Sequence, residues 1–295
     1  MTPGIASQLR AEIFRVRRQR SNWLLPILPI AGLLAVAGLT ASNYGLTSSA
    51  GKPPLTLARD LMDTTTLVMA MTLGVPVLVL GARAAAQDYQ YGTVRLLIAS
   101  GAGRVRLLGA KAGVTLLGAL VAFVVGCVAV VGAVGLSASS LPHGMASLPT
   151  TIDREMAVDT ACLGISLLSC AVLGVFTSSL SRSLTFGLTA AMVWFPSENV
   201  LTGVLFFLSG PQSRGTTGSF ASDGSLPALL SGLMLAPELN HMLQALQPWR
   251  ATVEMAARPL LEVSPAHALG VVSCWLAIFA LAAIAATVLR YDIRN

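Results

Sequence analysis

Long stretches without any charged side chain limit most strongly what this chain can fold into. Five such stretches cover residues 21–51, 64–82, 112–152, 160–181 and 263–289, and a sixth, 183–213, is interrupted only by Glu198. A helix that crosses a membrane needs about 20 mostly apolar residues, and every stretch is close to that length or longer. Only 11% of the residues are charged, against roughly 25% in ordinary soluble domains. The sequence therefore predicts a membrane protein with several spans.

The apolar stretches are continuous rather than alternating, and this favours helices over the strands of a membrane barrel. In hydrocarbon every backbone polar group needs an internal partner, which helices and closed barrels provide. Barrel strands would alternate between apolar and polar residues. We predict an all-α membrane protein with six transmembrane helices, at residues 23–40, 63–82, 112–136, 157–180, 184–208 and 268–289.

The positions of the basic residues give an orientation for these spans. The net charge of +6 could indicate a nucleic-acid partner, but the basic residues gather beside alternate span ends, as in multi-pass proteins whose basic connections face the cytoplasm. This predicts cytoplasmic termini, attraction to membrane lipid and no nucleic-acid partner. The clusters comprise Arg10, Arg15, Arg17, Arg18 and Arg20; Arg83, Arg95, Arg104, Arg106 and Lys111; Arg182; and Arg290 and Arg294.

The first 21 residues combine basic side chains with an apolar stripe. Ile5, Leu9, Ile13 and Val16 recur at helical spacing. A basic helix of this kind tends to lie in the membrane interface with its apolar face toward the lipid. We predict an amphipathic interfacial helix at 1–21, with a solvated basic tail as the alternative. Residues 22–295 then form one six-span transmembrane domain.

The cytoplasmic connection at 83–111 is long for a simple turn and has helical apolar spacing of its own. Residues 100–103, Ser-Gly-Ala-Gly, supply a flexible break, and Thr93 can cap the helix before that break. We predict two short amphipathic helices joined by a turn. Their apolar stripes are Val94, Leu97 and Ile98 in the first, and Val105 and Leu108 in the second.

The last outer connection, at 209–267, begins with a polar segment rich in Gly, Ser and Thr and then becomes apolar again. The apolar segment at 226–235 is too short to cross a membrane. We predict that this connection carries two or three short helices at the outer surface, before the last span.

Motifs of common enzymes are missing from the sequence. It has no HExxH pair for a zinc site, no GxSxG nucleophile elbow and no GxxxxGK[ST] loop for ATP. Its four cysteines fall inside predicted spans without CxxC spacing, as expected for apolar packing residues. The sequence therefore predicts neither an enzyme nor a metal site, and no cofactor held by this chain.

Glu198 is the one acidic or basic side chain inside a predicted span away from its ends, since Asp63 and Asp159 lie at outer span ends. A carboxylate in a membrane normally faces protein or a water-filled cavity, and Pro196 nearby favours a kink that frees carbonyl groups. Glu198, Asn199 and Phe206 are therefore candidates for the lining of a substrate pathway. The alternative is that the fifth span ends early and Glu198 reaches water.

The segment DYQYGTVRLL at 88–97, followed by Arg104 and Lys111, resembles the cytoplasmic signature of type-2 ATP-binding-cassette (ABC) exporter permeases. That signature has an acidic residue, Gly-Thr, two leucines, an Arg and a Lys at the next span. Asp88 replaces the usual Glu, and a proline commonly found before the Arg is absent. The resemblance implies that a coupling helix docks on an ATPase through Asp88, Tyr91, Gly92, Thr93, Val94, Leu97, Ile98 and Arg104.

From this resemblance we expect a permease subunit in the cell's inner (plasma) membrane that exports an amphipathic or hydrophobic compound, such as a drug-like molecule, lipid or peptide. Two such subunits, identical or different, would form the pathway, and separate cytosolic ABC ATPases would bind ATP and Mg. One rival is an ion-coupled secondary transporter, which should carry more buried charges in paired broken helices. Another is a membrane anchor or immunity subunit that transports nothing.

Overall fold

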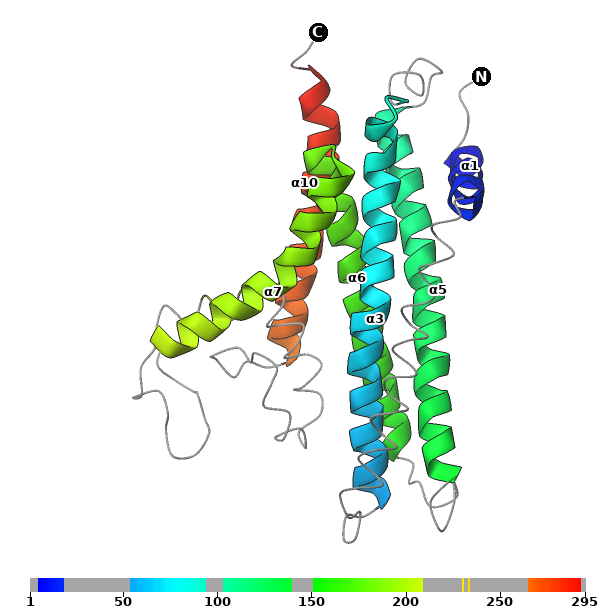
Figure 1. Cartoon of the computed structure of the whole chain (residues 1–295), viewed down its shortest axis with the longest axis vertical. Coiled ribbons are helices and arrows are strands. Elements are labelled where there is room, and N and C mark those ends of the chain that lie inside the picture. The colour runs from blue at the N-terminus through cyan, green and yellow to red at the C-terminus, as the bar shows by residue number, and fades with distance from the viewer. Residues whose placement is uncertain are drawn as a thin grey trace. The chain divides into compact units, whose positions relative to one another are not determined.

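The computed structural model describes residues 5–18, 54–93, 103–139, 151–208, 230, 233 and 265–292. Within these ranges the chain is helical and contains no strand (Figure 1). The all-α prediction is therefore confirmed for the described residues. Their helices are α1 (Ile5–Arg18), α3 (Pro54–Gln90), α5 (Arg104–Ser139), α6 (Thr151–Ser181), α7 (Leu184–Leu208) and α10 (Pro265–Asp292).

Three stretches of the described helices are long and apolar enough to cross a membrane. They are Arg106–Gly132 in α5, Thr160–Ser181 in α6 and His267–Ala286 in α10. These stretches support the prediction of a membrane protein. The complete six-span arrangement stays a prediction, because the first predicted span, 23–40, lies outside the described residues.

Most described helices extend beyond the predicted spans. The bounds of α7 match the prediction, whereas α3 continues through 83–90 and α5 begins at Arg104. The prediction of a separate second short helix, with Val105 and Leu108, is therefore wrong, since these residues belong to the first turns of α5. Arg and Lys are good helix formers, so charge at a membrane surface does not end a helix. The predicted first short helix and its stripe lie outside the described residues.

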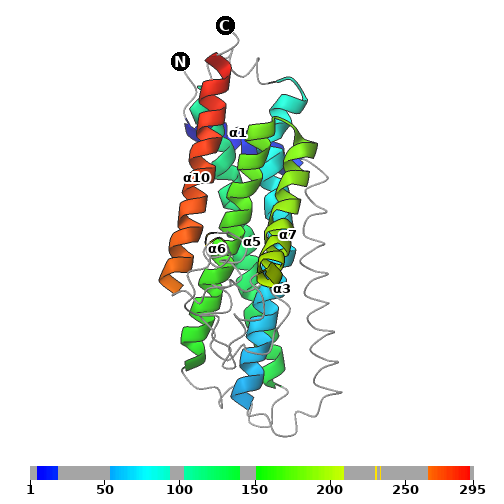
Figure 2. The ribbon, with the colours of Figure 1, turned by 90° about the vertical axis from the view of Figure 1, so that its left-hand side faces the viewer.

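The described helices belong to two compact units, Met1–Leu188 with Ala282–Asn295, and Thr189–Leu281. In the first unit α3 packs between α5 and α6, and α5 also contacts α6 (Figures 1 and 2). The centre of this packing is a cluster of buried apolar side chains from all three helices. It includes Met69, Leu73, Val77, Ala119, Leu163 and Leu167.

Small residues allow α3 and α6 to approach closely. A Cβ atom added at Gly174 of α6 would collide with the carbonyl oxygen of Leu78 in α3. One added at Gly81 of α3 would lie 2.8 Å from the carbonyl oxygen of Ala171 in α6. Membrane helices gain stability from such close backbone packing, because lipid tails supply no hydrophobic drive for helices to associate. This contact fixes how α3 and α6 cross.

Helix α1 lies crosswise against α5, near one end of that helix (Figures 1 and 2). Its predicted helical structure is confirmed over Ile5–Arg18. Part of the apolar stripe packs on protein: the Leu9 side chain lies beside Gly113 of α5, and Ile13 and Val16 line a groove described below. The sequence predicts that this stripe faces lipid, whereas part of it packs on protein in the structure.

In the second unit, three aromatic side chains of α7 and α10 form a cluster. Trp194 meets Trp275 and Phe279 edge to face, with ring centroids 5.9 and 5.4 Å away. The Trp275 indole N–H donates to the carbonyl oxygen of Leu233 at 2.7 Å. Edge-to-face pairs are favourable because the positive ring edge meets the negative ring face.

Candidate functional site

The carboxylate of Asp88 is the centre of a buried charge cluster in the first unit. Asp88 lies near the C-terminus of α3, and its side chain is 1% exposed. One oxygen, Oδ2, lies 2.6 Å from the Lys111 Nζ of α5. The other, Oδ1, accepts hydrogen bonds from Arg15 Nη1 of α1 at 2.5 Å and from the Thr93 hydroxyl at 3.2 Å. The cluster thus joins α1, α3 and α5.

Gly92 and Thr93 shape the end of α3 so that Thr93 reaches Asp88. Gly92 has a φ of 67°, which glycine adopts without the strain that a Cβ would add. Its N–H donates to the Tyr89 carbonyl at 3.3 Å, and the Thr93 N–H donates to the Asp88 carbonyl at 3.0 Å. These two bonds form a Schellman motif, a common way to end a helix. The described hydrogen bonds of Thr93 are thus made to Asp88 of α3, which precedes it in the chain.

Lys111 of α5 is held in place by contacts with α3 and with its own helix. Its side chain is 4% exposed, and its Nζ donates to the Ala85 carbonyl of α3 at 3.3 Å in addition to its ion pair. The Thr115 hydroxyl donates to the Lys111 carbonyl at 3.0 Å. A buried ammonium is costly without an anionic partner, so Lys111 requires Asp88.

Glu12 and Arg15 on α1 complete the cluster. The Arg15 Nη1 lies 3.8 Å from the Glu12 Oε1, and the Glu12 side chain is 11% exposed. The described cluster therefore contains two acidic and two basic side chains. Among the described residues, two cations directly approach Asp88, whereas the contact of Glu12 with Arg15 is longer.

The two carboxyl groups respond differently to this environment. Burial acts to raise the pKa of Asp88, but the charges and hydrogen bonds of Lys111 and Arg15 outweigh it and lower the pKa below 3.8. Burial raises the pKa of Glu12 above 4.5, and the partly cancelling charges of Lys111, Asp88 and Arg15 do not reverse this. Asp88 is therefore a stable carboxylate, whereas Glu12 retains its proton to higher pH than a solvated glutamate.

A further cation–aromatic contact lies beside α3 in the same unit. The Arg182 guanidinium, in the turn between α6 and α7, lies 5.6 Å from the ring centroid of Tyr89. Arg182 has a φ of 55°, a left-handed conformation that is uncommon for a residue with a side chain. The neighbouring Tyr91 is 65% exposed.

The structure brings together only some of the predicted docking residues. Asp88 and Thr93 are in contact, Gly92 forms the turn between them, and Arg104 begins α5. Val94, Leu97 and Ile98 lie outside the described residues, and so does the short helix that Thr93 was predicted to cap. Glu198, Asn199 and Phe206 lie on α7, and their predicted pathway role stays a prediction.

Sequence reasoning missed the α1 members of the cluster. The sequence indicates Arg15 only as part of a topology signal, and this residue lies 73 positions from Asp88. No spacing pattern reports a contact over that separation. The unusual signal was Glu12 itself, an acidic residue within a basic helix.

The chemistry of this cluster is that of a structural connector. Its carboxylates are opposed by cations, and among the described residues no group of three or more His, Cys, Asp or Glu side chains could bind a metal ion. The cluster instead joins three helices where the connection at 94–102 leaves α3. No protein-family model and no curated protein matches this chain. The resemblance to exporter permeases therefore stays a hypothesis based on the residues.

Proposed function

We propose that this chain is the transmembrane permease subunit of an ATP-driven exporter of the type-2 ABC kind. The observation that carries this proposal is the contact between residues of the signature. Asp88 binds Thr93 and Lys111, and Gly92 forms the turn that makes the Thr93 contact possible. A signature whose members hold one another in place at the base of a connection suits a segment that transmits force.

The cluster offers a physical route for that transmission. A docking helix at 94–102 would be attached to α3 through Gly92 and Thr93 and to α5 through Arg104. Because the buried Asp88–Lys111 pair is costly to separate, α3 and α5 would move together when the docking helix moves. Arg15 extends the same linkage to α1.

In this proposal, separate cytosolic ABC ATPases bind ATP and Mg and dock on the connection. Two permease subunits form the pathway for an amphipathic or hydrophobic compound in the inner membrane. Both termini are cytoplasmic, on the side of the ATPases. Glu198, Asn199 and Phe206 are the proposed pathway residues.

Co-purification with the ATPase of the same transporter tests the docking step. We expect Leu97→Asp to abolish co-purification and ATP-dependent transport into inverted vesicles, because a carboxylate would replace an apolar contact in the ATPase groove. The matched control, Leu246→Asp in the outer connection, should retain both. Docking on the connection is contradicted if Leu97→Asp behaves like the control.

The energy source separates the proposal from the ion-coupled alternative. Transport in vesicles should depend on ATP and persist when an ionophore removes ion gradients. Transport that needs the gradient but no ATPase would establish a secondary transporter. An ATPase complex without any transport would indicate the anchor or immunity role.

A further inference from the structure

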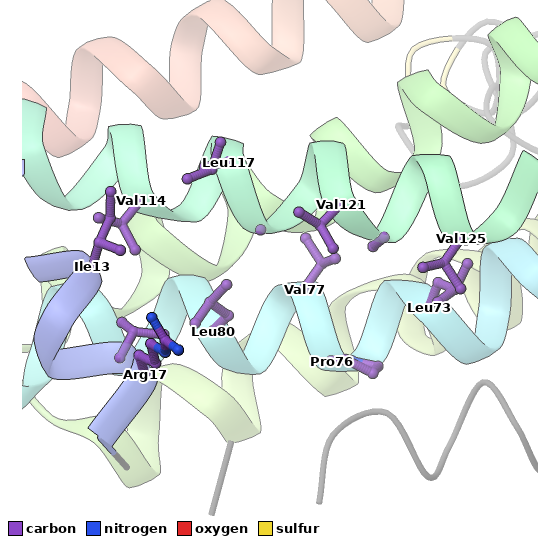
Figure 3. A pocket seen from close by; sticks show the side chains of 13 residues that line it. Ile13, Arg17, Leu73, Pro76, Val77, Leu80, Val114, Leu117, Val121 and Val125 are labelled. Atoms are coloured by element: carbon purple, nitrogen blue, oxygen red, sulfur yellow. The ribbon is translucent and has the colours of Figure 1, made fainter. Parts of the chain in front are cut away.

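An apolar groove lies between α3 and α5 in the first unit, and α1 lies at one end of it (Figure 3). Its volume is about 390 Å³. Pro76 and Gly118 supply little side-chain bulk to its walls. Its apolar lining includes Ile13 of α1, Val77 of α3, and Leu117, Val121 and Val125 of α5, and its one basic lining residue is Arg17.

Arg17 is the charged side chain of the groove, and it lies at the α1 end beside Ile13 (Figure 3). Within the described part of the chain it has no anionic partner. Asp88 binds Arg15 and Lys111, and Glu12 lies beside Arg15. Arg17 is an exposed residue, and a guanidinium presents several donors suited to a phosphate group. The groove therefore combines a long apolar wall with a cation at one end.

This combination matches one class of ligand, an amphipathic molecule with an anionic head and an alkyl chain. We propose that the groove binds an anionic phospholipid from the leaflet that borders α1. Its phosphate contacts Arg17, and one acyl chain lies along Val77, Val121 and Val125. Basic pockets between membrane helices recognise anionic head groups in this way. Inorganic phosphate alone would leave the apolar wall unfilled.

The site extends beyond the proposed export function and does not depend on it. A bound lipid would connect α1 to α3 and α5 at a second place, separate from the Asp88 cluster. The test below needs neither an ATPase nor a transported compound, so its failure would leave the proposed function untouched.

Lipid retention by the purified full-length protein tests this site. The protein is incubated with equal amounts of dioleoyl phosphatidylglycerol and dioleoyl phosphatidylcholine in detergent, and retained lipid is measured by native mass spectrometry. Wild type should retain phosphatidylglycerol preferentially. Arg17→Gln should lower its retention about fivefold, since one basic residue near an anionic head group contributes an interaction of that size. Arg10→Gln, an exposed arginine of α1 outside the groove, should have no effect.

Filling the groove provides a second readout. Val121→Trp should reduce retention of both lipids, and Leu117→Trp repeats the test if the first variant does not give a monodisperse protein. The proposal is overturned if Arg17→Gln and Arg10→Gln lower retention equally, or if a folded tryptophan variant retains wild-type lipid. It is also overturned if Val121→Cys forms a disulfide with Leu34→Cys in a background lacking the native cysteines, because the chain's own predicted first span would then occupy the groove.

Discussion

Asp88 contributes more to this protein than a surface carboxylate could. Exposed ion pairs add about 0–1 kcal/mol to folding stability. Breaking a buried pair costs more, because it leaves one charge buried away from water without a partner of opposite sign. The Asp88 and Lys111 side chains are 1% and 4% exposed, and Asp88 also accepts bonds from Arg15 and Thr93. The folded state therefore depends on the ionised form of Asp88. Its stabilising effect should be fully present above about pH 3.8 and be lost as the pH falls through its lowered pKa.

Removing the Asp88 charge should destabilise the protein strongly at pH 7. We expect Asp88→Asn to cost about 3 kcal/mol, because Lys111 would remain buried without an anion. The double variant Asp88→Asn, Lys111→Met should recover part of that loss. Thermal unfolding in detergent measures both effects. The control is Arg106→Met, which removes an exposed cation from the helix that carries Lys111. Additive losses from the two substitutions would contradict a coupled pair.

The contribution of Glu12 to stability should change with pH in the opposite direction to that of Asp88. Its raised pKa means that the folded state binds its proton more tightly than the unfolded state, so stability falls as the pH rises from about 4.5 through the folded pKa. Glu12→Gln removes that loss. Relative to wild type, the variant should unfold at a higher temperature at pH 7 and gain little at pH 4. A variant less stable than wild type at pH 7 would show that the contact with Arg15 outweighs the burial of Glu12.

At the scale of helices, hydropathy located the elements but underestimated their lengths. The predicted spans at 63–82 and 112–136 correspond to α3, Pro54–Gln90, and α5, Arg104–Ser139. A hydropathy window detects residues suited to lipid, whereas the helices continue through charged turns at the membrane surface. The start of α7 was predicted correctly because Arg182 and the following serine coincide with a real turn.

The candidate site was only half predictable for a related reason. The local sequence contains the signals for Gly92 and Thr93, since a glycine after a polar helix end commonly closes a helix. The contact of Arg15 with Asp88 arises only when α1 packs against α5. Contacts of this kind depend on tertiary packing, about which the spacing of residues within one helix gives no information.

Glycine at the α3–α6 crossing should be far less replaceable than glycine on an open helix surface. Gly174→Ala would place a Cβ against the backbone of α3 at Leu78, which cannot move without shifting the helix. We expect a loss of about 1–3 kcal/mol, as for other overpacked cores. Gly109→Ala on α5 has no atom within 4 Å of its new Cβ and should stabilise by about 0.5–1 kcal/mol.

Thermal unfolding of the two alanine variants side by side tests this contrast. Because both substitutions add the same methyl group to a helix, helix propensity cannot explain a difference in sign. Equal shifts in the two melting temperatures would mean that α3 and α6 are not in close backbone contact.

At the scale of the whole molecule, the number of spans determines where the termini lie. Three described stretches can cross a membrane, and the apolar stretches at 23–40, 63–82 and 184–208 raise the predicted number to six. An even number would place both termini on one side, and the basic residues before the first span and after the last predict that this side is the cytoplasm.

Labelling of single cysteines in intact cells and in inverted vesicles tests this topology. In a background without native cysteines, Thr2→Cys and Asn295→Cys should react with a membrane-impermeant maleimide only in inverted vesicles. Ser213→Cys, in the predicted outer connection, should react only in intact cells. Labelling of the two termini from opposite sides would require an odd number of spans. That result would contradict the six-span arrangement. The contact of Arg15 with Asp88 further requires that α1 and the docking connection lie on the same side, so it would be excluded only if Thr2→Cys were labelled on the side opposite to that connection.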